Sequence, residues 1–517
     1  MKRFSIAILI VSAISTTAFC QTVTGPDGEE FAARIVKDKL SDAWEVTYGP
    51  DNYLWITEAK GYTVSRINPA TGEKITLLDL TNKRAFPRYD KIPDEQDHGK
   101  PWPQGGLMGM ALHPQLLSGK PFVYLAYLYR FAGAQDTGNG SAANYGGYFF
   151  TTKIVRYQYD ATLQKLYNEV VICDTIAGSS DHNSGRLLVA PVDKKDYLFY
   201  SVGDMGAGQF DNGGRPNYAQ DINRYEGKVL RFNLEPAKNN NSWIPADNPF
   251  NRARPSAVWS YGHRNAQGLT YGVINGIGRI YSSEHGPYGD DEINIIEKGK
   301  NYGHPLIIGY NDNNYNGFAA SVSDKKTLPG QWHTTYPFIA SENEMAATMG
   351  ADFRGPIKSF NPATNAQLSS IFSRTVSGQS KGVEWKAEAP GSIEVYTSNA
   401  IPGWKNSLLI PTLKSGKLIR LKLNNKGDTI TGDTISYFKG NVRYRDIAVS
   451  PDGRKIYLAV DSSSTSSGPS EQHEKETYYN GCIIELSYLR GGETTAVMKQ
   501  KKLAKPTIKY VAGITGK

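Results

Sequence analysis

The amino-acid sequence predicts an all-β protein, a six-bladed β-propeller with long loops that crown one face. Stretches with helical periodicity are scarce. Instead, a tight turn of Pro, Gly, Asp or Asn followed by a short run of aromatic and β-branched residues recurs six times. The composition agrees, because 52 of the 517 residues are Gly and 32 are Tyr, whereas only 21% are charged. Such a balance is typical of β-proteins with many turns.

Each of the six turn signals marks one small antiparallel sheet. The signals lie at residues 49–57, 112–128, 189–204, 272–286, 405–423 and 450–460. A further strand often follows, as at 63–72 and 153–160. Repeated units of this kind are typical of a propeller, whose blades surround a central channel, and six signals favour six blades. A pair of β-sandwiches is the alternative that the same strands allow.

Two segments rich in Gly, Asn and Ser predict long loop insertions, at residues 129–150 and 311–382. Long loops on a propeller usually gather on one face and carry function. We therefore expect the functional site beneath them.

The first 20 residues are typical of a secretory signal peptide. Two basic residues precede an apolar run over 4–13, and small residues precede Gln21, where cleavage is expected. Lipid modification of Cys20 is the less favoured alternative, because Phe19 stands where such sites have a small residue. No later segment has 18 consecutive apolar residues, so we expect an exported protein, periplasmic or secreted, without a transmembrane span.

The charge of the chain is concentrated at its ends. Residues 21–490 are predicted to form the propeller domain, and 491–517 a basic tail or linker with six lysines from Lys499 onward. The net charge of +8 includes those lysines and the two basic residues of the leader. Residues 21–498 are therefore formally neutral, which does not support a nucleic-acid-binding surface.

His182, in the loop SSDHNSGRL, is a candidate general base, since histidine titrates near neutral pH and a carboxylate can orient its ring. Adjacent residues in an extended chain point apart. The expected orienting residue is therefore Asp204, in SVGDMG, rather than Asp181. The contiguous Ser180, Asp181 and His182 do not indicate a hydrolytic triad. Taken alone, this stretch is better explained by a surface histidine.

Four cations lie in turn-rich segments of different blades: Arg264, Lys414, Arg443 and Arg445. Arg443 and Arg445 are two residues apart, which places them on one face of a strand. Singly, each is explained as a solvated charge. If they converge at one mouth of the channel, they would suit a small polyanionic ligand, because arginine binds carboxylates through two parallel hydrogen bonds.

The stretch 284–303 gathers the carboxylates of Glu284, Asp290, Asp291 and Glu292 among Gly and Pro. Oxygen-rich loops with free backbone carbonyls suit Ca²⁺. Solvated acidic turns are the alternative. Downstream, Asp312 opens a segment that begins like an EF-hand loop, but Ser323 stands where the loop needs Glu, so an EF-hand is rejected.

Seven of these segments, in order along most of the chain, resemble the soluble, pyrroloquinoline-quinone (PQQ)-dependent glucose/sorbosone dehydrogenase family. They are GPDNYLWITE (49–58), QGGLMGMALHP (104–114), SSDHNSGRL (179–187), GHRNAQGL (262–269), SSEHGPYGDDEINIIEKGKNYGHP (282–305), GWKNSLLIPTLKSG (403–416) and NVRYRDIAVSPDG (441–453). The family fold is a six-bladed propeller, in agreement with the repeat pattern.

The resemblance implies the chemistry of the site. His182 would remove the proton of a sugar's anomeric hydroxyl while hydride passes to PQQ, Asp204 would hold the imidazole, and Arg264 would stabilise negative charge. The positions that match PQQ contacts are Gln104, Asp181, Arg264, Asn265, Lys414, Arg443 and Arg445.

The resemblance also implies two calcium sites. One Ca²⁺ would bind PQQ and the backbone carbonyls of Gly286 and Pro287. A second, structural Ca²⁺ would match Glu292, Tyr302, Asp312 and the backbone of Ile308. Asp312 thus receives a calcium role without an EF-hand.

The chain departs from the glucose enzymes at SGQSKGVEWK (377–386), which lacks their disulfide cysteine and the aromatic residue over the sugar. The sugar, the family's homodimer and the external electron acceptor (quinone, cytochrome or dye) therefore stay open. Two other functions are alternatives: a Ca²⁺-dependent propeller sugar lactonase, and a non-catalytic propeller that binds carbohydrate or protein.

Overall fold

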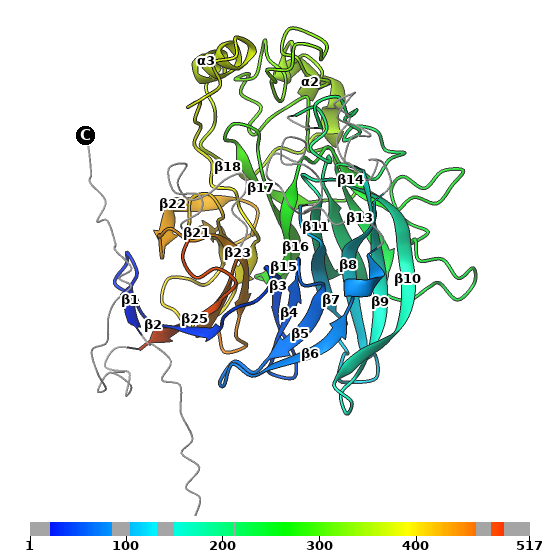
Figure 1. Ribbon diagram of the computed structural model, residues 1–517, viewed down its shortest axis with the longest axis vertical. Coiled ribbons are helices and arrows are strands. Elements are labelled where there is room, and N and C mark those ends of the chain that lie inside the picture. Colours follow the sequence, from blue (N-terminus) through cyan, green and yellow to red (C-terminus); the bar gives the residue numbers. More distant parts are fainter. Residues whose placement is uncertain (1–20, 85–103, 132–148, 210–211, 462–476, 491–517) are drawn as a thin grey trace, which may run out of the picture.

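The computed structural model describes residues 21–84, 104–131, 149–209, 212–461 and 477–490, and they form six small antiparallel sheets around a common centre (Figure 1). The prediction of a six-bladed propeller is confirmed. The expected leader, the expected tail and most of the insertion 129–150 lie outside the described residues.

Five blades are each built from four strands that follow one another in the chain. They are β3 (Ala43–Tyr48), β4 (Leu54–Glu58), β5 (Thr63–Ile67) and β6 (Lys74–Asp79), with η1 (Thr81–Lys83) after them; β7 (Leu107–Leu112), β8 (Phe122–Phe131), β9 (Phe150–Asp160) and β10 (Lys165–Gly178); β11 (Ser184–Val192), β12 (Lys195–Val202), β13 (Lys228–Asn233) and β14 (Val258–Tyr261); β15 (Ala266–Ile274), β16 (Ile277–Glu284), β17 (Asp291–Ile296) and β18 (Lys358–Phe360); β19 (Glu394–Tyr396), β20 (Ser407–Pro411), β21 (Leu418–Leu423) and β22 (Ile430–Tyr437).

The sixth blade joins the two ends of the described chain. Its strand order is β1 (Gln21–Thr24), β2 (Glu30–Lys37), β25 (Ile483–Leu489), β24 (Lys455–Val460) and β23 (Tyr444–Val449). Strand β2 pairs antiparallel with β25 (Figure 1), and Arg34 donates two hydrogen bonds, of 3.0 and 2.8 Å, to the carboxylate of Glu485. An N-terminal strand thus closes the ring without a covalent link.

The six turn signals of the sequence fall one to a blade. Five of them include the turn between the first and second strands, and the sixth, at 405–423, includes the turn between β20 and β21. In the first turn Asn52 adopts φ 60°, a conformation that Asn tolerates, and the Asp51 carboxylate accepts a hydrogen bond from the indole of Trp55 at 3.0 Å. Local turn chemistry therefore locates one turn in each blade.

The apolar core lies between neighbouring blades. Inner strands are covered on both faces, as in β4, where all five residues are buried and the first three, Leu54, Trp55 and Ile56, form an apolar run. Each junction has its own cluster of buried side chains, such as Trp55 against Tyr159 between the first and second blades, with ring centroids 4.9 Å apart. Six such junctions hold the ring of blades together, so most of the apolar packing lies between strands and little of it in the loops.

The insertion 311–382 differs from its prediction as a long loop. It contains β18, the outermost strand of the fourth blade, together with α2 (Glu342–Met349), η5 (Gly350–Asp352) and α3 (Asn365–Val376). Helix α3 begins with a capping box between Thr364 and Gln367. Residues 305–385, which include this insertion, are here called the crown. A separate apolar cluster that includes Tyr315, Phe318 and Phe372 holds the crown above one end of the strands (Figure 1).

Among the described residues, none of the helices combines the length and the apolar character that crossing a bilayer requires.

Candidate active site

The predicted site residues share one end of the propeller. In a four-stranded antiparallel blade, the loop that enters the innermost strand and the loop between the second and third strands leave the same edge. The predicted residues occupy these two loop types: Gln104 before β7, His182 before β11, Arg264 before β15 and Arg443 before β23, with Asp204 after β12, Gly286 after β16 and Lys414 after β20. Strand topology alone therefore brings segments of five blades to one face.

His182 and Asp204, the expected base and orienting residue, are in contact. Nδ1 of His182 lies 2.7 Å from Oδ1 of Asp204, and both side chains are buried. Burial alone would raise the pKa of Asp204, but its interactions with His182 and His304 hold that pKa well below its usual range. An ionised Asp204 accepts the Nδ1 proton, so Nε2 of His182 keeps its lone pair, as a general base requires.

The second oxygen of Asp204 is surrounded by donors that the sequence did not reveal. Oδ2 accepts hydrogen bonds from the Tyr336 hydroxyl at 3.0 Å, from Nε2 of His304 at 2.9 Å and from the Asn217 amide at 3.1 Å. The carboxylate is thus held from both sides. His304 lies in a segment that matches the family, but nothing in its local spacing indicates a partner. Tyr336 lies in the crown, outside all the turn signals and family-like segments of the sequence.

The side-chain amide of Gln209 lies between Arg264 and His182. Its Nη2 donates to Oε1 of Gln209 at 2.8 Å and its Nη1 donates to the carbonyl of His285 at 3.1 Å. The Gln209 amide nitrogen lies 3.0 Å from Nε2 of His182 and 3.1 Å from Oδ2 of Asp181. The base and the guanidinium are therefore separated by the space of one small polar group, and Gln209 is a further residue that the sequence missed.

Buried groups behind Arg264 fix its backbone. The carboxylate of Glu284 accepts the backbone N–H of Arg264 and that of Asn265, the latter at 3.2 Å. Its other oxygen lies 3.1 Å from Nδ1 of His263, whose ring stacks on Tyr302 with centroids 4.5 Å apart. Although burial opposes it, the neighbouring His263 lowers the pKa of Glu284. Arg264 is therefore held in position before a ligand binds.

Three of the four predicted cations belong to one contact network. Arg443 and Arg445 both reach Oδ2 of Asp461, at 3.4 and 2.5 Å, as expected for two side chains on one face of a strand. Arg445 also donates to Gln267 at 3.0 Å, and Gln267 donates to Asn265 at 3.2 Å, next to Arg264. Lys414 lies instead against Trp385, 3.1 Å from its carbonyl and 5.0 Å from its ring centroid.

The remaining predicted contacts also lie at this mouth. Gln104 donates to Oδ1 of Asp181 at 2.9 Å and accepts from the backbone of Asn183 at 3.1 Å. Nδ2 of Asn265 and Nε of Arg264 are buried and have no hydrogen-bond partner among the described residues. Unpartnered buried donors are costly, and they are what a bound carbonyl or carboxylate group would satisfy.

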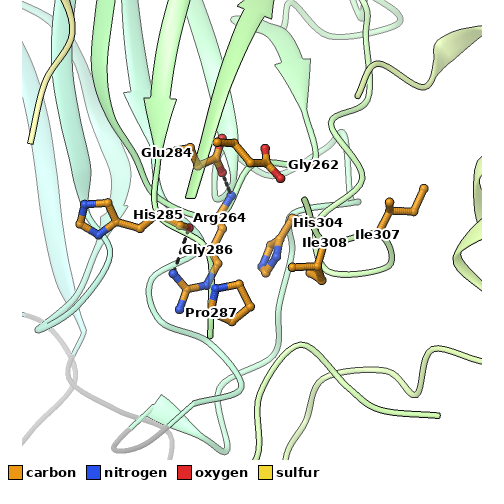
Figure 2. A pocket seen from close by; sticks show the side chains of 10 residues that line it. Gly262, Arg264, Glu284, His285, Gly286, Pro287, His304, Ile307 and Ile308 are labelled. Carbon is orange, nitrogen blue, oxygen red and sulfur yellow. Dashed lines mark hydrogen bonds between the residues drawn. The ribbon is translucent and has the colours of Figure 1, made fainter. Parts of the chain in front are cut away.

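A small cavity adjoins Arg264 and includes four of the six predicted metal ligands, Gly286, Pro287, Glu292 and Ile308 (Figure 2). His304 borders the same cavity, and His285 points away from it (Figure 2). Burial raises the pKa of Glu292 well above its usual range. It also raises the pKa of neighbouring Asp290 to about 7. Two buried carboxylates without a Lys or Arg partner in the described part of the chain fit a divalent cation.

The other two predicted metal ligands are placed differently. The Tyr302 hydroxyl donates to the carbonyl of Ile295 at 2.5 Å and accepts from the backbone of Glu297. The backbone carbonyl oxygen of Tyr302 is therefore the atom of this residue that is left to bind a metal. Asp312 is exposed, and its carboxylate accepts the backbone N–H of Asn314 at 3.1 Å. Within the described ranges, no three His, Cys, Asp or Glu side chains form a group that could hold a metal ion. The predicted set thus depends on backbone oxygens.

Comparison with known proteins decides the family. The model of the glucose/sorbosone dehydrogenase family matches residues 40–354 and 375–467, most of the chain. The chain belongs to this family. It is 30% identical over 501 residues to quinoprotein glucose dehydrogenase B of Acinetobacter calcoaceticus, covering 92% of this chain and 96% of that protein. It is 27% identical over 434 residues to an aldose sugar dehydrogenase of Escherichia coli, covering 83% and 90%.

Solved structures agree on the fold. The chain is similar to the PQQ-bound aldose sugar dehydrogenase of Streptomyces coelicolor, with a TM-score of 0.56, 22% identity, and coverage of 88% and 97%. It is also similar to the soluble aldose sugar dehydrogenase of Escherichia coli in its cofactor-free form, with a TM-score of 0.56, 23% identity, and coverage of 88% and 99%. The match to the glucose/sorbosone dehydrogenase family model omits 355–374, which includes β18 and most of α3.

Proposed function

We propose that this chain is an exported PQQ- and Ca²⁺-dependent dehydrogenase that oxidises the anomeric hydroxyl of an aldose-type sugar to the lactone. One observation carries the proposal. The His182–Asp204 pair is buried, and Nε2 of His182 points toward Arg264, with only the side-chain amide of Gln209 between them. The names of the relatives, quinoprotein glucose dehydrogenase and aldose sugar dehydrogenase, support the same substrate class.

The residues at the mouth fit a polyanionic cofactor. PQQ has three carboxylates, and Lys414, Arg443 and Arg445 supply positive charge while Gln104, Asp181 and Asn265 supply polar contacts around it. The buried, unpartnered amide nitrogen of Asn265 and Nε of Arg264 are donors that a bound group would satisfy. When bound, PQQ supplies the acceptor for the two electrons that leave the sugar.

His182 and Arg264 divide the work of the protein. Nε2 of His182 accepts the hydroxyl proton as the C–H bond of the anomeric carbon breaks, and Asp204 stabilises the imidazolium that forms. Arg264 presents a fixed positive charge where negative charge develops, because its backbone and two guanidinium nitrogens are already held. Preorganised charge of this kind needs no rearrangement during the reaction.

Calcium completes the proposal. The backbone carbonyls of Gly286 and Pro287 would hold one Ca²⁺ beside the cofactor, where it acts as a Lewis acid. Glu292, Asp312 and the backbone of Tyr302 and Ile308 would hold a structural Ca²⁺ near the crown. Buried carboxylates with raised pKa support this assignment, because a divalent cation offsets the cost of their charge.

The cellular setting follows from the sequence. We propose that residues 1–20 are a signal peptide, that 21–490 are one propeller domain and that 491–517 are a basic tail. Electrons would leave to an external acceptor, and the family's homodimer is part of the same proposal.

Reconstitution tests the proposed function. The purified full chain, loaded with PQQ and Ca²⁺, should reduce a redox dye when aldoses are added, and His182→Ala should lower kcat by about 10²–10⁴-fold. A matched control is His113→Ala, which removes a buried histidine of the second blade away from the site. No dye reduction together with no PQQ binding contradicts the proposal. Lactone hydrolysis by PQQ-free protein would favour the lactonase instead, and an unchanged sugar-binding readout without turnover would favour a binding propeller.

A further inference from the structure

Asp204 stands between two imidazoles. Its Oδ1 faces Nδ1 of His182 at 2.7 Å, and its Oδ2 faces Nε2 of His304 at 2.9 Å and the hydroxyl of Tyr336 at 3.0 Å. Asp204 is fully buried, and His304 and Tyr336 are nearly so. At this distance Nε2 of His304 donates its N–H to the carboxylate.

Three separate parts of the chain build this arrangement. Asp204 follows β12, His304 follows β17, and Tyr336 belongs to the crown. The crown is fastened to the Asp204 loop just before Tyr336: Thr334 donates to the carbonyl of Gly208, and the Thr335 hydroxyl lies 2.9 Å from the carbonyls of both Gly213 and Arg215. The rings of His304 and Tyr336 also meet edge to face, with centroids 5.7 Å apart. These contacts fix both donors relative to the carboxylate.

Oδ1 of Asp204 also accepts the backbone N–H of Gly206 at 2.9 Å. The terminal torsion of an aspartate is soft, so hydrogen bonds at Oδ1 alone would still let the carboxylate turn about that oxygen. Donors at Oδ2 fix its plane. They therefore decide how well Oδ1 accepts the Nδ1 proton of His182, and so which ring nitrogen stays free.

We propose that His304 and Tyr336 are positioning residues for the general base: acting through the far oxygen of Asp204, they hold His182 in the tautomer whose Nε2 is free to accept a proton. The inference rests on the proposed function in taking His182 as the base. Neither residue is expected to touch the sugar or PQQ.

The structure provides matched variants. Tyr336→Phe removes only the hydroxyl donor. Tyr315→Phe is its control, because Tyr315 is a buried crown tyrosine whose hydroxyl has no hydrogen-bond partner among the described residues. His304→Met removes the N–H donor, whereas His304→Gln retains an N–H at a similar reach and should rescue the effect.

The first readout needs no cofactor. In the PQQ-free full chain labelled with ¹⁵N-histidine, the NMR shifts of the two His182 ring nitrogens, assigned by their loss in His182→Ala, report the tautomer. We expect the Nδ1–H form in the unsubstituted protein, in Tyr315→Phe and in His304→Gln, and a mixture with the Nε2–H form in Tyr336→Phe and His304→Met. A ring that stays in the Nδ1–H form in the last two variants, or that is not in that form to begin with, overturns the inference.

The second readout uses the loaded enzyme. Tyr336→Phe and His304→Met should lower kcat by about tenfold and change KM by less than about twofold, the pattern expected when a group that acts in the transition state is misplaced. An unchanged kcat overturns the inference. If the tautomer responds as expected but the unsubstituted protein oxidises no sugar, the proposed function fails while the positioning of His182 stands, so the two failures are distinguishable.

Discussion

At the scale of single residues, the site depends on side chains whose protons and charges are fixed before a ligand arrives. His182 has one nitrogen committed to Asp204, and Arg264 has a guanidinium committed to Gln209 and to the carbonyl of His285. A planar guanidinium makes the two contacts through different nitrogens in a fixed geometry, whereas an ammonium ion has all its donors on one freely rotating atom. The identity of Arg264, and not only its charge, is therefore part of the account.

Arg264→Lys tests that point. We expect kcat to fall by about 10²-fold while PQQ still binds, because the positive charge remains but is no longer held in place. The dye-reduction assay with saturating aldose measures the change, and Arg279→Lys on β16, which contacts Lys426 and Asp428 outside the site, is the control. Activity close to that of the unsubstituted enzyme would show that Arg264 has no such role.

The site residues differ in how far the sequence revealed them. His182, Asp204 and Arg264 lie in segments with recognisable local patterns, so they could be predicted. Gln209 and Tyr336 could not, because their roles come from partners in other loops. Local spacing carries no record of such contacts.

At the scale of elements, the turns were the feature that the sequence predicted best. The Pro, Gly, Asp and Asn turns located a turn in every blade, whereas β2, whose partner β25 lies some 450 residues away, has no local sign of its pairing. The Gly- and Asn-rich stretches of residues 311–382 predict a loop, whereas the structure has two short helices there. The Thr364–Gln367 capping box was the signal that could have located α3.

The inner strand β19 provides a test of stability against pH. Burial and the neighbouring Asp446 raise the pKa of Glu394 from 4.5 to about 8. The folded protein then retains a proton that the unfolded chain releases, so this residue's contribution to stability is lost as pH rises from about 4.5 to about 8. Glu394→Gln, a neutral mimic, should match the unsubstituted protein near pH 5 and be more stable at pH 8 in urea unfolding. A difference of equal size at both pH values would contradict this.

At the scale of the whole molecule, Arg186 links blades across the central channel. From β11 it reaches Glu45 on β3 at 2.5 Å and Asp446 on β23 at 3.2 Å, and it donates to the carbonyl of Gln267 on β15 at 3.0 Å. All these side chains are buried. One guanidinium thus pairs with acidic side chains from two blades and ties both to a third, although burial raises the pKa of Glu45 to about 8.

Arg186→Met should lower the free energy of unfolding by about 3–5 kcal/mol, because it leaves two buried carboxylates without their cation. Denaturant unfolding of the PQQ-free protein measures the loss. Adding Glu45→Gln to the same variant should restore part of it, since one of the stranded charges is removed. A loss below about 1 kcal/mol would show that the channel carboxylates are compensated in another way.

The central claim, that His182 is the base in a PQQ-dependent oxidation of sugars, has one direct measurement. The absorption spectrum of the PQQ- and Ca²⁺-loaded protein is recorded before and after an aldose is added, without any electron acceptor. The account predicts that bound PQQ is converted to its reduced spectrum within seconds in the unsubstituted protein and about 10²–10⁴-fold more slowly in His182→Ala, with PQQ bound in both. Reduction at the same rate in both proteins, or bound PQQ that no aldose reduces, would contradict it.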